Sequence, residues 1–367
     1  MRIGQVSISY KPILGGQEVY LDNLSKILKD NNHTIHVYQP DMGVDDPELF
    51  LTPNPNNPTA FQKLIPRLMR YNFLLLTHQL SNLRKEDLLI IHYPEHYLPV
   101  FWHKKTLVLT HGINWDFDPT AKKFQRKALA KLAFKFAWKF VANDTNFLRA
   151  MGVDIRPKEK MFQEVLPGRW FIPNCADTEL FTKTAGIREL KKLNPVIVPR
   201  NFSKARGVDL AVDAFELIAS KEPSLNLVIV GSNLPVPDSL DYGEQLLFKV
   251  KSSKFRDRIV FFGSKPWREM RDVYSSAVAT LIPTRGNEGT SLAALESMSC
   301  GTATVTTSVA GLKDLPSVQI PPKPAEIAKA ILNTIRNKDK IGIDQQKEVR
   351  GVYNIENWKN AWLKVIN

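Results

Sequence analysis

Two acidic residues, Glu288 and Glu296, lie on either side of a Gly-Thr-Ser turn in the stretch RGNEGTSLAALESMSCG, residues 285–301. The residues before it predict a strand that ends at residues 283–284, and the apolar positions after the turn predict a helix over residues 291–299. The first backbone N–H groups of such a helix have no partner within the helix, and they point back toward the turn. The pattern therefore places two carboxylates beside a helix start, where anions bind.

The start of this helix suits a phosphate, because the N–H groups of Thr290, Ser291 and Leu292 and the helix dipole favour negative charge. Gly289 belongs to the same turn. The two carboxylates could each accept two hydrogen bonds from a vicinal diol. A phosphate between two diols describes a nucleotide sugar. The alternative is that the first glutamate is a solvated loop residue and the second a charge on the helix surface.

The elements that must position these residues alternate along the chain. Buried strands are expected at residues 3–9, 34–38, 88–92, 106–110, 196–199, 225–230, 259–262 and 279–282, with helical periodicity between most of them, for example at 18–29, 210–219 and 267–275. This alternation predicts an α/β protein with parallel sheets that bind ligands at the carboxyl ends of strands. The pattern runs twice, so we expect two Rossmann-like lobes that face an interdomain cleft.

Composition agrees with two lobes, because 367 residues with 43% apolar side chains exceed one ordinary core. The net charge of +13 indicates an acidic partner: nucleic acid, an anionic membrane surface or a phosphorylated small molecule. Two cysteines make no disulfide framework or metal-ligand spacing, which favours a cytoplasmic protein. The first residues lack a signal-peptide pattern, and no apolar run reaches the ~18–20 residues that span a bilayer. Any membrane contact is therefore expected to be peripheral.

Further motifs occur in order along the chain: Gly15-Gly16-Gln17-Glu18, Thr110-His111-Gly112, FIPNCAD at residues 171–177, and Arg200 with Arg206-Gly207. Together with the spacing of the two glutamates, this set resembles family 4 of the retaining glycosyltransferases, glycosyl transferases group 1, which have the GT-B architecture. Residues 354–362 are similar to that family's closing helix. The resemblance implies an N-terminal acceptor lobe, residues 1–172, on which the helix at 353–367 packs, and a donor lobe, residues 173–352.

The resemblance also implies roles for single residues. Arg200 and Arg206 would bind the donor diphosphate and stabilise the charge that grows on the leaving group. Glu288 would hold the hydroxyls of the transferred sugar, and Glu296 those of the ribose. His111 would face the sugar and the acceptor.

The glycine pair Gly15 and Gly16 would let backbone approach the phosphate or the acceptor without a Cβ in the way. The alternative is a plain turn between strand and helix. Two departures from the family pattern occur in the donor motifs. Arg206 stands where the family usually has lysine, which keeps the charge but changes its geometry. Thr290-Ser291 replaces the usual Phe-Gly, so the sugar is not defined. The family mechanism implies front-face substitution with retained anomeric configuration.

One triplet, Asp116-Phe117-Asp118, has the Asp-x-Asp form by which another glycosyltransferase architecture holds a divalent metal. It lies in a loop flanked by Trp115 and Pro119, and single triplets are common by chance. We interpret it as part of the loop and expect no metal site and metal-independent activity.

A basic stretch, KKFQRKALAKLAFKFAWKF at residues 122–140, contains seven basic residues and no acidic one. Lysines recur at every fourth position and predict a stripe along a helix: Lys123, Lys127, Lys131, Lys135 and Lys139. Such a helix could lie on an anionic bilayer. The alternative is a core helix with a solvated charged face.

These features favour a cytoplasmic or peripheral membrane glycosyltransferase. It would move a sugar from a nucleotide-diphosphate sugar, a UDP- or GDP-sugar, to a glycan, glycolipid or lipid-linked acceptor in cell-surface polysaccharide or glycolipid synthesis, with no cofactor beyond the donor. Two alternatives stay open: a nucleotide-sugar epimerase with the same lobes, and a basic nucleotide- or nucleic-acid-binding protein. The chain shows no nucleic-acid recognition motif, so only non-specific, salt-sensitive binding of nucleic acid is expected.

Overall fold

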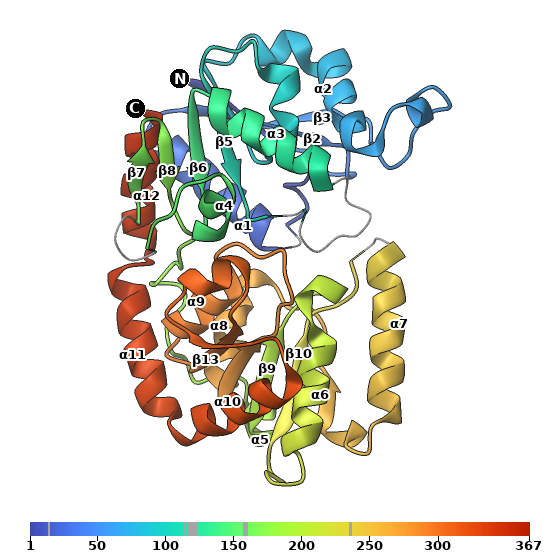
Figure 1. Cartoon of the computed structure of the whole chain (residues 1–367), viewed down its shortest axis with the longest axis vertical. Coiled ribbons are helices and arrows are strands. Elements are labelled where there is room, and N and C mark those ends of the chain that lie inside the picture. The colour runs from blue at the N-terminus through green and yellow to red at the C-terminus, as the bar shows by residue number, and fades with distance from the viewer. Residues whose placement is uncertain (14, 114, 116–122, 157–160, 235–236) are drawn as a thin grey trace. The chain divides into compact units, whose positions relative to one another are not determined.

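The computed structural model describes residues 1–13, 15–113, 115, 123–156, 161–234 and 237–367. It divides into two compact units (Figure 1). The first unit contains Met1–Pro173 and Lys359–Asn367, and the second contains Asn174–Trp358.

An eight-stranded sheet forms the centre of the first unit. Its strand order is β3-β2-β1-β4-β5-β6-β8-β7. The strands are β1 (Arg2–Val6), β2 (Thr34–Pro40), β3 (Leu49–Thr52), β4 (Leu88–Ile91), β5 (Thr106–Thr110), β6 (Lys139–Ala142), β7 (Gln163–Leu166) and β8 (Arg169–Phe171). All neighbours are parallel except β7 and β8. The helices of this unit are α1 (Gly16–Asp30), α2 (Arg67–Leu83), α3 (Lys123–Phe136), α4 (Thr145–Ala150) and most of α12 (Ile355–Ile366).

A six-stranded, fully parallel sheet forms the centre of the second unit, in the order β11-β10-β9-β12-β13-β14. The strands are β9 (Pro195–Pro199), β10 (Asn226–Val230), β11 (Ile259–Phe261), β12 (Ala279–Ile282), β13 (Thr304–Thr307) and β14 (Val318–Ile320). The helices are α5 (Arg188–Lys192), α6 (Val208–Ile218), α7 (Pro237–Ser252), α8 (Met270–Ser276), α9 (Leu292–Ser299), α10 (Pro324–Arg336) and α11 (Lys338–Gly351).

The strands of the second sheet are apolar because helices cover both of its faces. Val196 and Val198 point into a core that includes Phe215 of α6 and Ile331 of α10. Ile197 alternates with them and joins a separate cluster on the opposite face. A strand buried on both faces reads as a continuous apolar run, as PVIVP does here. All eight strands expected from the sequence are present.

In each sheet, the direction in which the chain crosses from strand to strand changes at one place, which we call the reversal point. Crossovers run outward from β1 to β2 and β3 on one side and from β4 to β5 and β6 on the other, and β9 and β12 repeat this arrangement in the second unit. The loops that follow two such neighbouring strands run in opposite directions. In parallel sheets this forms a crevice at the carboxyl ends of the strands, where ligands bind. The segments that follow β1, β4, β9 and β12 are therefore the first places to look for function.

The basic stretch does not form one helix, which corrects the expected five-lysine stripe. Helix α3 ends at Phe136, and Lys139 lies in strand β6. There its ammonium donates to the backbone oxygen of Val365, 2.5 Å away, and lies 4.3 Å from the centre of the Trp138 ring. The chain leaves the helix after Phe136 because strand β6, which begins at Lys139, pairs with β5 on one side and with β8 on the other.

Candidate functional site

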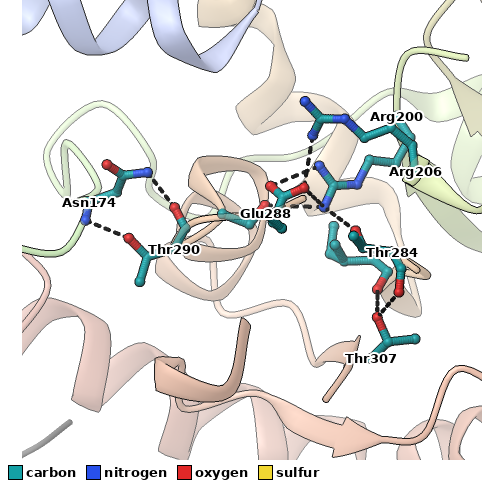
Figure 2. A network of polar contacts seen from close by, with 9 residues as sticks. Asn174, Arg200, Arg206, Thr284, Glu288, Thr290 and Thr307 are labelled. Atoms are coloured by element: carbon teal, nitrogen blue, oxygen red, sulfur yellow. Dashed lines mark hydrogen bonds and ion pairs between the residues drawn. The ribbon is translucent and has the colours of Figure 1, made fainter. Parts of the chain in front are cut away.

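The first candidate site lies at the reversal point of the second sheet. Arg200 follows β9 directly, and Glu288 lies in the segment that joins β12 to α9. Figure 2 shows the guanidinium groups of Arg200 and Arg206 converging on the carboxylate of Glu288. Arg200 Nη1 donates to Glu288 Oε1 over 3.3 Å, and Arg206 Nη1 donates to Oε2 over 3.0 Å. The structure thus brings together residues that are up to 88 positions apart in sequence.

Burial strengthens the interactions between the charges of this cluster. The side chains of Arg200 and Glu288 are 4% and 9% exposed, whereas that of Arg206 is 42% exposed. Burial lowers the pKa of Arg200 to about 10, which still leaves it charged at pH 7. Burial alone would raise the pKa of Glu288, but the two arginines reverse this and lower it below its usual value. The cluster therefore contains two positive charges and one negative charge, which is a net charge of +1. Arg206 is its solvent-exposed member.

Local backbone geometry places Arg206 at this point. It ends a short 3-10 turn, Lys204–Arg206, and is followed by Gly207 with φ of +67°. A Cβ on Gly207 would lie 2.0 Å from the backbone oxygen of Pro283 at the end of β12. The N–H of Arg285 also donates to the oxygen of Ala205 over 2.8 Å. Only glycine fits this close approach, so the loop after β9 is fixed against the loop after β12.

The second predicted carboxylate, Glu296, lies inside α9 and is 4% exposed. It accepts from Trp267 Nε1 over 2.6 Å and from the hydroxyl of Tyr274 over 3.1 Å. Burial raises the pKa of Glu296 to about 7, against the effect of these two hydrogen bonds. Its acceptor capacity is therefore shared with two aromatic residues, Trp267 and Tyr274, that the sequence did not single out.

The turn before α9 is anchored to the segment that begins the second unit. The N–H of Asn174 donates to Thr290 Oγ1 over 2.7 Å, and its side-chain amide donates to the oxygen of Thr290 (Figure 2). Ser291 Oγ accepts from Arg200 over 3.5 Å, and Leu292 starts the helix. The hydroxyl of Thr290 thus has a structural function, and Gly289, like Thr290, is buried.

Arg200 has one more partner that the sequence did not reveal. Its Nη2 donates to Thr284 Oγ1 over 3.0 Å, and the backbone oxygen of Thr284 accepts from Thr307 Oγ1 over 2.5 Å. Both threonines are fully buried. A threonine near the end of a buried strand is the only sequence signal for this contact, and it is too common to be informative.

A second group of predicted residues lies at the reversal point of the first sheet, after β1, β4 and β5. Gly15 precedes α1 and Gly16 is its first residue. The backbone of Gly15 is extended, and a Cβ there would lie 3.3 Å from Glu18 Oε2. Gln17 donates to Ser7 Oγ over 3.0 Å and accepts from the hydroxyl of Tyr93. The turn after β1 is thus tied to the segment after β4.

His111 follows β5 and is partly buried beside a second histidine, His92, which follows β4. Nδ1 of His92 and Nε2 of His111 are 3.2 Å apart, and the two rings stack with their centres 5.5 Å apart. Burial lowers the pKa of His111 to about 3, and burial and the neighbouring histidine lower the pKa of His92 well below its usual value. Both rings are neutral at pH 7. The sequence interpretation included His111 and missed His92.

The Asp-x-Asp triplet does not enter this description, because Asp116 and Asp118 lie outside the described residues. Within the part of the chain that the structure describes, no three His, Cys, Asp or Glu side chains are grouped so that they could hold a metal ion.

Helix α3 presents four of the five expected lysines to solvent: Lys123, Lys127, Lys131 and Lys135. Phe124 and Phe136 on the same helix are 85% and 62% exposed, whereas Ala130 and Ala133 pack into the core. The helix therefore has a basic outer face with two exposed aromatic rings. Among the described residues, no helix has the length and hydropathy needed to cross a membrane.

Comparison with known proteins identifies the second unit. Residues 195–337 match the family model described as Glycosyl transferases group 1. Mannosylfructose-phosphate synthase from Agrobacterium fabrum is 32% identical over 109 residues, which cover 29% of this chain and 24% of that protein. A phosphatidylinositol N-acetylglucosaminyltransferase subunit from Arabidopsis thaliana is 24% identical over 356 residues, 91% of this chain and 74% of that protein.

Solved structures resemble the whole chain. Sucrose-phosphate synthase from Thermosynechococcus elongatus has a TM-score of 0.83 at 17% identity and covers 100% of this chain and 98% of its own. The Anabaena protein Alr3699/HepE in complex with UDP-glucose has a TM-score of 0.75 at 16% identity, with 100% and 99% covered. These likenesses show the fold. Taken with the family match, they show that this chain has the GT-B fold and that residues 195–337 match the glycosyl transferases group 1.

Proposed function

We propose that the protein transfers a sugar from a nucleotide-diphosphate sugar to a hydroxyl group of a glycan, glycolipid or lipid-linked acceptor. The observation that carries this proposal is the cluster of Arg200, Glu288 and Arg206 at the reversal point of a parallel sheet. Its net positive charge suits a diphosphate, and its buried carboxylate can accept sugar hydroxyls. The Anabaena protein binds UDP-glucose in its crystal structure, which makes UDP-sugars the first donors to test.

In this proposal the bond between the anomeric carbon and the diphosphate oxygen breaks while the acceptor oxygen bonds to the same face of that carbon. The acceptor proton passes to the departing phosphate oxygen, so the configuration is retained. Arg206, the more exposed guanidinium, would turn from Glu288 to the diphosphate, and Arg200 would stabilise the charge that develops on the leaving oxygen. NMR of the first product formed checks this step, and an inverted anomer would refute it.

Two guanidinium groups supply the positive charge that a divalent metal supplies to the diphosphate in other transferases. We therefore propose that transfer is metal-independent. The assay is the rate in excess chelator and after manganese is added back. Equal rates are expected, whereas loss of the activity in chelator and its recovery with manganese would show that a metal takes part.

Donor binding is tested with a thermal-shift panel of UDP, GDP, ADP and dTDP in chelator, on the native protein and on Glu296→Ala. A ligand that binds the folded state raises the unfolding temperature. We expect one diphosphate to stabilise the native protein and to stabilise the variant much less, because Glu296 would hold the ribose. No shift with any of the four would count against a nucleotide-sugar donor.

The acceptor side of the proposal rests on α3. Four exposed lysines and two exposed aromatic rings suit an anionic membrane surface, where each basic residue contributes about 1 kcal/mol. The name of the Arabidopsis relative includes phosphatidylinositol, a membrane lipid. We therefore propose a lipid-linked acceptor at the cytoplasmic face of a membrane, where both unpaired cysteines would stay reduced.

Liposome flotation tests this membrane contact. We expect the protein to float with vesicles that contain anionic lipid and not with neutral ones, and the variant with alanine at Lys123, Lys127, Lys131 and Lys135 to stay unbound. A matched control removes four exposed lysines elsewhere, Lys221, Lys251, Lys254 and Lys340, and so loses the same net charge. If both variants lose binding equally, the total charge and not this helix is responsible.

A further inference from the structure

A buried chain of hydrogen bonds leads from the core of the first unit to His111. Gln5, in the central strand β1, donates from Nε2 to Ser25 Oγ of α1 over 2.7 Å. Its Oε1 lies 2.9 Å from His92 Nε2, and His92 Nδ1 lies 3.2 Å from His111 Nε2. Gln5 and His92 are both fully buried. Four side chains, from β1, from α1 and from the residues that follow β4 and β5, thus form one continuous chain of hydrogen bonds.

The direction of each hydrogen bond follows from the first. Because the amide nitrogen of Gln5 faces Ser25, its oxygen faces His92 and can only accept, so His92 carries its proton on Nε2. A neutral imidazole has one N–H, and His92 Nδ1 is therefore an acceptor. The contact with His111 then requires the proton to be on His111 Nε2.

The second nitrogen of His111, Nδ1, is left as an acceptor. Within the described residues no hydrogen bond to it is found, and it is not among the buried polar atoms that lack a partner. The ring is held from the sides by Tyr20 of α1, with ring centres 4.9 Å apart, and by Tyr93, 5.8 Å away. Tyrosines are ordinarily neutral at pH 7, so neither ring promotes protonation of the histidines.

We propose that Gln5 and His92 are positioning residues that keep His111 neutral with its proton on Nε2, so that Nδ1 accepts a hydrogen bond from a sugar hydroxyl. A protonated His111, or one with its proton on Nδ1, would have no acceptor for that hydroxyl. The identity of the bound group as a sugar rests on the proposed function, but the state of His111 does not.

The state of His111 is measured directly by ¹⁵N NMR of the histidine-labelled native protein, with assignments from His92→Asn and His111→Asn. Protonation of both rings on Nε2 at pH 7, with neither ring titrating between pH 8 and pH 5.5, is the expected result. A proton on Nδ1 of His111, or a mixture of the two forms, would overturn the proposal. This measurement needs no substrate, so it stands or falls separately from the transferase activity.

Gln5→Glu provides the second test. A carboxylate facing His92 Nε2 stabilises the charged imidazolium, so the pKa of the histidine pair should rise. The ratio of the variant's transfer rate to the native rate at the same pH should then fall as the pH decreases from 8 to 6. Gln39→Glu is the matched control, because Gln39 is an equally buried glutamine on β2 that bonds to the backbone of Lys11 instead.

Substitution of His92 separates positioning from packing. His92→Leu removes both the acceptor for His111 and the donor for the buried oxygen of Gln5, so we expect a lower unfolding temperature and a fall in kcat/KM of about tenfold. His92→Asn offers a side-chain carbonyl to the same N–H and should stay within about threefold of the native value. Equal losses in the two variants, in proportion to their loss of stability, would assign His92 a purely structural role.

Discussion

At the scale of single residues, the charges of the candidate site pair with one another. Arg200 and Arg206 are both paired with Glu288, so a diphosphate must compete with a carboxylate that is held within 3.3 Å of each guanidinium. The sequence indicated all three residues through motif spacing. It could not indicate their mutual pairing, because the pairing depends on loops that leave different strands. The contacts of Glu296 with Trp267 and Tyr274 depend on the same kind of packing.

Arg206 stands where the family usually has lysine, and the exposed half of its side chain suggests that charge matters more here than geometry. We expect Arg206→Lys to keep kcat/KM within about tenfold of the native value. Arg206→Ala should lose roughly a hundredfold or more, which corresponds to ~3 kcal/mol of transition-state stabilisation. Steady-state kinetics with the donor found in the thermal-shift panel give both numbers. Comparable losses in the two variants would mean that the planar fork is required.

The pKa of Glu296, raised to about 7 by burial, predicts pH-dependent binding of the nucleotide. Only the ionised carboxylate accepts both ribose hydroxyls, so affinity should rise as the proton leaves. Between pH 6 and pH 8 the ionised fraction of such a group grows about tenfold, and the affinity should follow it. Calorimetry at several pH values measures this. Glu296→Gln corrects for titration of the nucleotide phosphate, and an identical pH profile in the variant would exclude this role.

At the scale of elements, the apolar strands were predictable from β-branched runs, and the strands that were missed are of two kinds. β13 is rich in threonine, and its hydroxyls are buried because each finds a partner, such as Thr304 with Ser297 and Thr306 with Ser317. β3, β7, β8 and β14 are short and lie toward the sheet edges. The expected lysine stripe places the end of helix α3 at Lys139, three residues beyond its actual end at Phe136. The lysine spacing gives no sign that β6 begins at Lys139.

The loop between β9 and α6 gives an element-scale prediction. Gly207→Ala places a methyl group against the backbone of Pro283 in a left-handed conformation, so unfolding should become easier by roughly 3 kcal/mol or more. Gly43→Ala is the matched control, because Gly43 has φ of +75° with nothing within 4 Å and should cost only about 1 kcal/mol. Denaturant unfolding compares the two. Equal costs would mean that the close approach to β12 is not required.

At the scale of the whole molecule, two sheets with the same order of their first six strands place His111 of the first unit and Arg200 and Glu288 of the second after strands that lie at equivalent points. The repeated alternation in the sequence predicted this architecture, and the structural neighbours confirm the fold class. Gln5 and His92 could not be found in this way, because a glutamine in one strand and a histidine after another carry no local signal. Their role follows only from the parallel pairing of β1 with β4.

The last residues of the described chain belong to the first unit, and Trp362 of α12 lies against Tyr20 with ring centres 6.2 Å apart. Trp362 is fully buried. Trp362→Ala should therefore reduce the free energy of unfolding by about 3–5 kcal/mol, although Tyr20 is far away in sequence. Lys364→Ala, which changes an exposed residue of the same helix, should have little effect. Similar midpoints of denaturant unfolding for the two variants would contradict this assignment.

The central claim is that Arg200, Glu288 and Arg206 form the site for the donor diphosphate. Isothermal titration of UDP in chelator, on the native protein and on Arg206→Ala, tests it most directly. The claim predicts saturable binding of UDP to the native protein and an affinity at least tenfold weaker in the variant. Equal affinities for the two proteins would contradict it, because the diphosphate would then bind elsewhere.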